Sequence, residues 1–300
     1  MPDGRRALSA RTVPAAYHRD LSALRRRRDK GPALATYLDE LLAGAARRVA
    51  AAAEHEPLDA LRERAGEVRP GPSLAAALGG AGVGVLAEIK RASPSKGDLA
   101  VHLDAPAQAR AYVDGGAVAV SVLTEPERFK GSLTDLADVA ALGVPALRKD
   151  FIVDRYQIWE ARAAGAAAVL LIVAALDEPT LAALHDEAAA AGLDALVEIH
   201  DEAEAAAARR IGATLVGVNA RDLRSFEVDP AAFARLRPHV PPGVVAVAES
   251  GIANAADVVR AAEAGADAVL VGESLVRAPN PTAAVAELVA AGRATSTSLS

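Results

Sequence analysis

Short apolar runs alternate with alanine-rich amphipathic stretches along the chain from about residue 84 onward. The apolar runs are continuous, which is typical of parallel strands that are buried on both faces of a sheet. Most amphipathic stretches end in glycine, as at Gly165-Ala166 and Gly265-Ala266, and glycine just past a helix supplies the left-handed residue that ends it. A unit of helix, glycine and strand that recurs every ~20–35 residues predicts a parallel sheet with crossover helices.

The pattern contains eight such strands, and eight parallel βα units close naturally into a (β/α)8 TIM barrel of about 250 residues. We therefore predict an α/β protein of this architecture. The alternative is a doubly wound open sheet, which favours a glycine-rich phosphate turn after the first strand, whereas this chain has Lys90-Arg91-Ala92-Ser93-Pro94 there. The predicted strands are Val85–Ile89, Ala117–Leu123, Pro145–Arg148, Ala168–Val173, Ala195–Ile199, Leu215–Val218, Val244–Ala248 and Ala268–Val271.

Extra helices precede the first predicted strand. Apolar residues at helical spacing predict a helix over 33–54, a second short helix from Pro57, and a third over 74–78 that Ser73 can cap. These helices can close one end of the barrel. Residues 1–32 carry many arginines and little apolar periodicity, so we expect a disordered basic arm. With a disordered tail over 293–300, the predicted barrel domain covers 33–292.

The composition argues against several classes of protein. The formal net charge is −6, which disfavours a general nucleic-acid binder, and no aromatic residues interleave the arginines of the arm to support an RNA-binding role. The chain has no cysteine, so disulfides and thiolate chemistry are excluded. The longest apolar run, Ala166 to Leu176, is too short to span a bilayer, and the N-terminus lacks the apolar region of a signal peptide. We expect a cytoplasmic protein without membrane contact.

Charged and polar residues follow most predicted strands at the same end. Active sites of such barrels lie at the C-terminal ends of the strands, so these side chains should converge on one mouth. Lysines and carboxylates together can supply general acids and bases near neutral pH. A lysine can also form a Schiff base, so its presence does not fix the reaction. The candidates are Glu88, Lys90, Lys149, Glu198, Asn219, Arg221 and Glu249.

Two glycine-serine loops follow the last two predicted strands. Backbone N–H groups and hydroxyls at Ser250-Gly251 and at Gly272 and Ser274 are typical of the phosphate site of this barrel. The Ser93 hydroxyl can add a further donor. The loops therefore predict a phosphorylated ligand.

Aromatic residues are scarce, so their placement is informative. Phe129 and Phe151 follow the second and third predicted strands and can hold an aromatic ring over the mouth. Phe226, Phe233 and Trp159 are interpreted as packing residues on or beside helices. The six histidines show no metal-ligand spacing, so we predict no metal site.

These stretches together resemble the indole-3-glycerol phosphate synthase family. The likeness covers about residues 33–292, and its motifs occur in order at a spacing that suits a barrel. The basic arm before Ala33 departs from the family pattern. The motifs are Glu88-Ile89-Lys90-Arg91-Ala92-Ser93-Pro94-Ser95, Leu123-Thr124-Glu125, Phe129 with Gly131-Ser132, Arg148-Lys149-Asp150-Phe151, Gln157-Ile158, Val197-Glu198-Ile199, Gly217-Val218-Asn219-Ala220-Arg221-Asp222-Leu223, Ala248-Glu249-Ser250-Gly251-Ile252 and Val271-Gly272-Glu273-Ser274-Leu275.

The resemblance implies a reaction of tryptophan biosynthesis that needs no cofactor. 1-(2-Carboxyphenylamino)-1-deoxyribulose 5-phosphate closes to indole-3-glycerol phosphate, with loss of carbon dioxide and water. By resemblance Lys149 is the general acid, Lys90 holds the substrate carboxylate and assists, and Glu198 is the base of the dehydration. Which lysine acts in which step stays open.

The resemblance also implies binding roles for the remaining residues. Glu88 would orient the lysines. Phe129 and Phe151 would hold the anthranilate ring against the sugar, and such proximity accelerates ring closure. The remaining positions are assigned to substrate positioning (Asn219, Arg221, Glu249) and to phosphate binding (Ser250, Gly251, Gly272, Ser274).

Two other classes of function are compatible with parts of the pattern. One is a different phosphosugar barrel enzyme, such as an isomerase or a Schiff-base aldolase that uses Lys149. The other is a barrel that only binds a phosphate metabolite, although mere binding does not require the full acid–base set. The expected partner is a small molecule. We expect a monomer, because the extra helices can cover a pairing surface, and association with other tryptophan-pathway enzymes.

Overall fold

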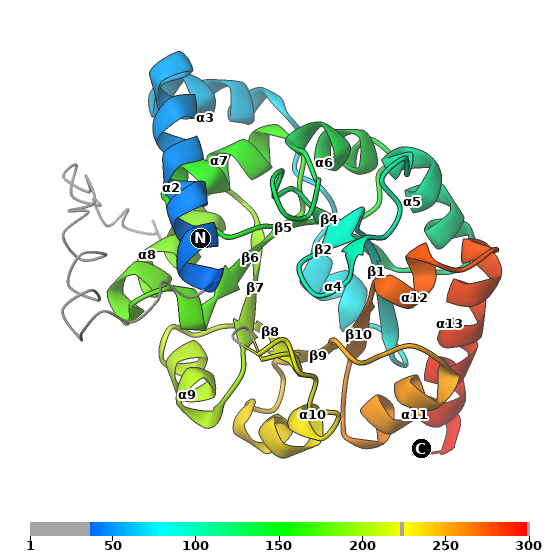
Figure 1. Cartoon of the computed structure of the whole chain (residues 1–300). Coiled ribbons are helices and arrows are strands. Elements are labelled where there is room, and N and C mark those ends of the chain that lie inside the picture. Colours follow the sequence, from blue (N-terminus) through cyan, green and yellow to red (C-terminus); the bar gives the residue numbers. More distant parts are fainter. Residues whose placement is uncertain (1–36, 223–224, 299–300) are drawn as a thin grey trace, which may run out of the picture. The chain divides into compact units, whose positions relative to one another are not determined.

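The computed structural model describes residues 37–222 and 225–298, and the predicted arm over 1–32 lies outside these described residues. Within them, eight parallel strands close into a barrel in the order β1-β10-β9-β8-β7-β6-β5-β4, and helices surround it (Figure 1). The predicted (β/α)8 TIM barrel is confirmed. The strands are β1 (Gly84–Ile89), β4 (Ala119–Leu123), β5 (Ala146–Lys149), β6 (Ala168–Ile172), β7 (Asp194–Ile199), β8 (Leu215–Asn219), β9 (Val245–Glu249) and β10 (Ala268–Val271).

The remaining elements connect the strands or precede them. A small antiparallel hairpin, β2 (Ala92–Ser93) with β3 (Gly97–Asp98), lies in the segment after β1. The helices are α2 (Tyr37–His55), α3 (Leu58–Glu67), α4 (Leu74–Leu78), α5 (Ala105–Asp114), α6 (Leu133–Ala140), α7 (Arg155–Ala163), α8 (Glu178–Ala190), α9 (Glu202–Arg210), α10 (Ala232–Leu236), α11 (Ala255–Glu263), α12 (Glu273–Val276) and α13 (Pro281–Ser298), with 3₁₀ turns η2 (Val173–Ala175) and η3 (Arg237–His239).

Alternation along each strand divides the apolar side chains between two cores. Outward residues such as Val120 and Val122 of β4 pack against the helices, while inward residues such as Leu86, Leu147 and Leu196 fill the barrel. Side chains in a strand alternate faces, so the continuous apolar runs of the sequence serve both cores. The same alternation directs the polar residues at the C-terminal strand ends inward.

Helix α4 closes the N-terminal end of the barrel, as the sequence suggested for one of these helices. Leu74 and Leu78 are fully buried in the inner core. The Ser73 hydroxyl accepts a hydrogen bond from the Ala76 N–H, which caps the helix, and donates one to Asp194 at the start of β7. One end of the barrel is therefore sealed, and the other end is left for the site.

One predicted strand start is wrong by two residues. Strand β4 begins at Ala119, whereas the apolar run suggested Ala117. The Ala117 N–H donates to the Tyr112 carbonyl at 3.0 Å, which is the long bond that closes a helix C-terminus after a left-handed glycine. Gly116 has that conformation, with φ of 96°. The residues after Gly116 therefore still belong to the end of α5.

The expectation of a disordered tail from residue 293 is also wrong for residues 293–298. Helix α13 continues through Ser298. Gly292, the last residue of the predicted domain, is a packing position inside this helix. A Cβ there would lie 2.6 Å from the Val83 carbonyl oxygen, so glycine lets α13 approach the segment that enters β1.

Candidate active site

The polar strand ends converge on one cavity of about 510 Å3 at the C-terminal mouth of the barrel. All the candidate residues from the sequence line it. They come from β1 and its following segment, from the ends of β5, β7, β8 and β9, and from the loops after β4 and β10. In chain order they are Glu88, Lys90, Ser93, Phe129, Lys149, Phe151, Glu198, Asn219, Arg221, Glu249, Ser250, Gly251, Gly272 and Ser274.

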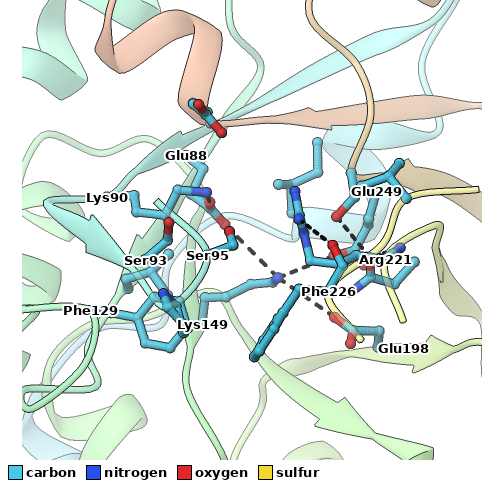
Figure 2. Close-up of a pocket in the computed structure, with 18 of the residues that line it drawn as sticks. Glu88, Lys90, Ser93, Ser95, Phe129, Lys149, Glu198, Arg221, Phe226 and Glu249 are labelled. Atoms are coloured by element: carbon cyan, nitrogen blue, oxygen red, sulfur yellow. Dashed lines mark hydrogen bonds and ion pairs between the residues drawn. The ribbon is translucent and has the colours of Figure 1, made fainter. Parts of the chain in front are cut away.

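The Lys149 ammonium group lies among three buried carboxylates (Figure 2). Its Nζ is 3.2 Å from Glu249 Oε2, 3.6 Å from Glu198 Oε2 and 3.9 Å from Glu88 Oε2. The three glutamates are 2–4% exposed. Buried charges are costly unless they are paired, so these four side chains behave as one electrostatic unit.

The surroundings shift the pKa values of this unit in different directions. Burial alone lowers the pKa of Lys149, but Glu249, Glu198 and Glu88 outweigh it and raise the pKa well above its ordinary value. Burial raises the pKa of Glu249, and repulsion from Glu198 adds to this against the opposing effect of Lys149. Burial acts in the same sense on Glu198, yet Lys149 and His200 lower its pKa. Carboxylates whose pKa values diverge are suited to different proton-transfer roles.

Lys90 forms a separate pair with Glu88 next to the cluster. Lys90 Nζ is 2.9 Å from Glu88 Oε1, and the two residues lie two apart, as expected for side chains that share a face. Burial raises the pKa of Glu88, but Lys90 and then Lys149 lower it below its ordinary value overall. Glu88 thus lies between the two lysines and holds both of them at the mouth.

Gly217 makes room for the Glu249 carboxylate. A Cβ at residue 217 would overlap Glu249 Oε1, far inside van der Waals distance. No side chain fits at that distance, so the neighbouring strand β8 must carry glycine at this level if Glu249 is to reach Lys149. The Gly217 of the family-like motif therefore has a steric reason that the sequence did not reveal.

The predicted phosphate loops lie beside this cluster. Ser250 has a left-handed backbone with φ of 65°, and its hydroxyl donates to Asn219 Oδ1 at 2.8 Å. Among the described residues the buried Ser274 hydroxyl has no hydrogen-bond partner. An unpartnered buried hydroxyl is costly unless a ligand or water engages it. The Ser274 hydroxyl is therefore available to a hydrogen-bonding group of a ligand at the mouth.

Two phenylalanines form an aromatic wall, as the sequence suggested. The ring centroids of Phe129 and Phe151 are 6.2 Å apart, and both side chains line the cavity. Phe233 is buried in the outer core, and Trp159 donates to Glu187 with Arg62 over its ring, so these two are packing residues as expected.

The interpretation of Phe226 as a packing residue is wrong, because its side chain lines the cavity. Its ring meets Tyr37 edge-on, with centroids 5.3 Å apart. Its φ of 61° is left-handed, an unusual conformation for a large side chain, and Arg221 Nη1 donates to its carbonyl at 2.9 Å. The loop turns this ring into the mouth.

Helix α2 contributes residues that the sequence analysis did not single out for the site. Tyr37, Leu38 and Leu41 line the cavity. Their helical spacing predicts an amphipathic helix with one buried face. In the structure that face packs over the barrel mouth. Periodicity indicates that a helix face is buried, but it does not indicate which surface the face covers. The spacing therefore could not identify these residues as part of the site.

His200 lies behind the cluster and contacts two carboxylates. Its Nε2 is 3.4 Å from Glu198 Oε1 and its Nδ1 is 3.1 Å from Glu204 Oε2. Burial alone would lower the pKa of His200, but Glu198 and Glu204 raise it to about 10.

Among residues 37–222 and 225–298, no group of acidic and histidine side chains is arranged to hold a metal ion. In the same range, no helix is long and apolar enough to cross a bilayer.

The fold and the mouth together define a (β/α)8 barrel enzyme with acid–base groups, an aromatic wall and two serine-glycine loops at one cavity. A barrel of this kind is shared with solved structures of low sequence identity. The 3-hexulose-6-phosphate synthase of Salmonella typhimurium superposes with a TM-score of 0.57 at 17% identity, over 70% of this chain and 98% of that one. That likeness concerns the fold alone.

Sequence comparison identifies the family. The indole-3-glycerol phosphate synthase family model matches residues 38–288. An indole-3-glycerol phosphate synthase of Mycolicibacterium smegmatis is 53% identical over 259 residues, covering 86% of this chain and 95% of that protein. Indole-3-glycerol phosphate synthase 1 of Streptomyces coelicolor is 52% identical over 85% of this chain and 95% of its own length. The chain belongs to the indole-3-glycerol phosphate synthase family, which acts in tryptophan biosynthesis.

Proposed function

We propose that this protein closes 1-(2-carboxyphenylamino)-1-deoxyribulose 5-phosphate to indole-3-glycerol phosphate and that Lys149 is its general acid. The observation that carries the proposal is the placement of Lys149 Nζ within 4 Å of three carboxylates in a cavity that also holds the aromatic wall and the phosphate loops. An ammonium group kept protonated in this way can give a proton to a developing alkoxide.

In the first step the carboxylate-bearing ring carbon bonds to the ketone carbon of the sugar. The ketone oxygen takes a proton from Lys149 and becomes a hydroxyl group. Carbon dioxide then leaves, and its bonding electrons restore the aromatic ring. Lys90, which is held by Glu88, supplies the positive charge for the substrate carboxylate until that departure.

The second step removes water. The hydroxyl group leaves with a proton, and a proton of the adjacent CH2 goes to a base. Glu198 is our choice, because its lowered pKa keeps it ionised and its Oε2 lies 3.6 Å from Lys149 Nζ. The lysine can therefore recover a proton within the cluster.

The substrate is positioned at its two ends. Phe129 and Phe151 hold the anthranilate ring, and the loops with Ser250, Gly251, Gly272 and Ser274 hold the phosphate. Asn219, Arg221 and Glu249 shape the floor between them. Fixing both ends places the ring carbon near the ketone, which is where proximity contributes most to rate.

The test is indole fluorescence on mixing the protein with the substrate, with no metal or cofactor added. A rise that Lys149→Ala abolishes, while the variant keeps its fold and still binds substrate, supports both the reaction and the acid. No rise with wild-type protein contradicts the reaction. Borohydride trapping of a covalent adduct would favour a Schiff-base aldolase using Lys149 instead.

We also infer a cytoplasmic monomer that associates with other enzymes of the tryptophan pathway. The support for a monomer is that α2 and α3 lie on the barrel surface, where Tyr156 of α7 donates to the Glu56 carbonyl between them. Light scattering on the purified protein tests the oligomeric state. A dimer mass at micromolar concentration contradicts the inference.

A further inference from the structure

Two buried carboxylates lie directly behind the aromatic wall, outside the proton-transfer cluster. The first is Glu125, just after β4, which is 1% exposed. Its oxygens accept hydrogen bonds from the backbone N–H groups of residues 127, 128 and 129, at 3.2, 2.7 and 3.0 Å. Glu125 therefore fixes the loop conformation that presents the Phe129 ring.

The second carboxylate, Asp150, does the same for the other phenylalanine. It is 4% exposed, and its Oδ1 accepts the Phe151 N–H at 2.8 Å. Its Oδ2 accepts from the Thr124 hydroxyl at 2.7 Å and from Arg148 Nη2 at 3.0 Å. Each wall residue thus has a backbone N–H held by its own buried carboxylate.

A single side chain from helix α2 reaches both carboxylates. Arg48 Nη1 lies 3.5 Å from Glu125 Oε1, and its Nη2 lies 3.6 Å from Asp150 Oδ1. Among residues 37–222 and 225–298, the ion pairs of Glu125 involve Arg48 alone, whereas Asp150 also has Arg148. The planar guanidinium can address two carboxylates at once, which an ammonium group cannot do with fixed geometry.

We propose that Arg48 is a positioning residue that sets the separation of Phe129 and Phe151 and thereby the affinity for the substrate's aromatic ring. It touches neither the cavity nor the reacting atoms. It acts through Glu125 and Asp150, whose hydrogen bonds hold the two phenylalanine backbones. The proposal rests on the proposed function, in which these rings hold the anthranilate group.

The same geometry explains why α2 belongs to the site although no proton-transfer residue comes from it. Its Leu42 and Ala45 pack with Phe151 in a small core, and Arg48 follows one turn later. Arg128, next to Phe129, also contacts α2, through Glu40 at 3.5 Å and over the ring of Tyr37. Its ion pair joins two exposed side chains, and such pairs contribute little. Arg48 is therefore the principal polar connection from α2 to the aromatic wall.

The experiment measures binding of two ligands by calorimetry. One is the alcohol obtained by reducing the substrate ketone, which keeps the ring and the phosphate. The other is ribulose 5-phosphate, which lacks the ring. The variants are Arg48→Ala and Arg48→Lys, and the matched control is Arg47→Ala, since Arg47 is exposed on the same helix. We expect Arg48→Ala to weaken the ring-bearing ligand about tenfold, with ribulose 5-phosphate changed less than twofold.

Arg48→Lys should fall between wild type and Arg48→Ala, and it serves alone if Arg48→Ala does not fold. Equal weakening of both ligands, or an effect no larger than that of Arg47→Ala, would overturn the proposal. The binding measurements need no turnover, so the proposed reaction and the proposed role of Arg48 can be contradicted independently. If wild-type protein produces no indole fluorescence, the proposed reaction fails, while the ratio of the two affinities still tests Arg48.

Discussion

Lys149 and Glu249 face each other across the barrel, with Nζ and Oε2 3.2 Å apart, although they come from β5 and β9, which are separated by three strands in the sheet. Gly217 leaves the space that this contact needs. The ammonium group consequently lies over the middle of the mouth and not at its wall. A central ammonium group can reach a substrate that is bound at two opposite sides of the mouth, as the proposed function requires.

Replacing Lys149 by Met should remove the proposed proton donor and leave the side-chain volume nearly unchanged. We expect the turnover number to fall by about 10³-fold, within the usual range for a general acid. Affinity for the reduced substrate should change less, because Lys90 and the phosphate loops remain. Single-turnover fluorescence gives the rate of the chemical step. A variant that retains a tenth of the wild-type rate would contradict the assignment of Lys149.

Gly217→Ala should disturb the site without replacing any ionisable residue. The new Cβ would collide with the Glu249 carboxylate, so Glu249 must leave Lys149 or β8 must shift. We expect about 1–3 kcal/mol of lost stability from such overpacking, with activity lowered at least tenfold. Gly66→Ala is the control, because nothing lies within 4 Å of a Cβ there. Full activity in Gly217→Ala would show that Glu249 does not need its present position.

The sequence was sufficient for the barrel and for the residues at the strand ends. Glu88 and Lys149 could be predicted to meet because parallel strands direct their C-terminal ends to one mouth. Side chains that reach the site from elsewhere could not be placed in this way. Tyr37 belongs to a helix before the barrel. The position of the Phe226 ring depends on a left-handed backbone conformation, which no local sequence pattern near it predicts.

Ion pairs between residues far apart in the sequence could not be predicted from the sequence either. Arg48 and Glu125 are 77 positions apart, and nothing in a basic position on an amphipathic helix identifies its partner. The helix over residues 293–298, where the sequence predicted a disordered tail, was missed for a related reason. Helix α13 packs against Val83 at Gly292, a tertiary contact that the local sequence does not show. The partner of Arg48 and the packing of Gly292 are both determined by tertiary contacts, which local sequence patterns do not reveal.

His200 should make the stability of the folded protein depend on alkaline pH. Its pKa is raised from 6.5 to about 10 because Glu198 and Glu204 outweigh the effect of burial. A raised pKa means that this stabilisation is complete below about pH 6.5 and is lost as the pH rises through about 10. We expect His200→Gln to lower the free energy of unfolding by a few kcal/mol at pH 6, with little difference left near pH 11.

Denaturant unfolding of both proteins between pH 6 and pH 11 measures this difference. His239→Gln is a suitable control, because the contact between His239 and Glu202 is exposed to solvent, and exposed pairs are screened. A gap between wild type and His200→Gln that stays constant over the whole range would mean that the imidazole is not charged in the folded protein.

Two substitutions at Ser250 separate its role in binding from its backbone conformation. Both Ser250→Ala and Ser250→Gly remove the hydroxyl, so both should raise KM about tenfold if its O–H turns from Asn219 to the substrate phosphate. They differ at φ of 65°, where a side chain costs ~1 kcal/mol and glycine does not. The glycine variant should therefore be more stable than the alanine variant by about that amount while binding substrate equally poorly.

Inhibition by inorganic phosphate should weaken in parallel with the rise in KM, since it reports on the same donors. An unchanged KM in both variants would remove Ser250 from the phosphate site, and a difference in KM between them would mean that the shape of the loop, and not the hydroxyl, determines binding.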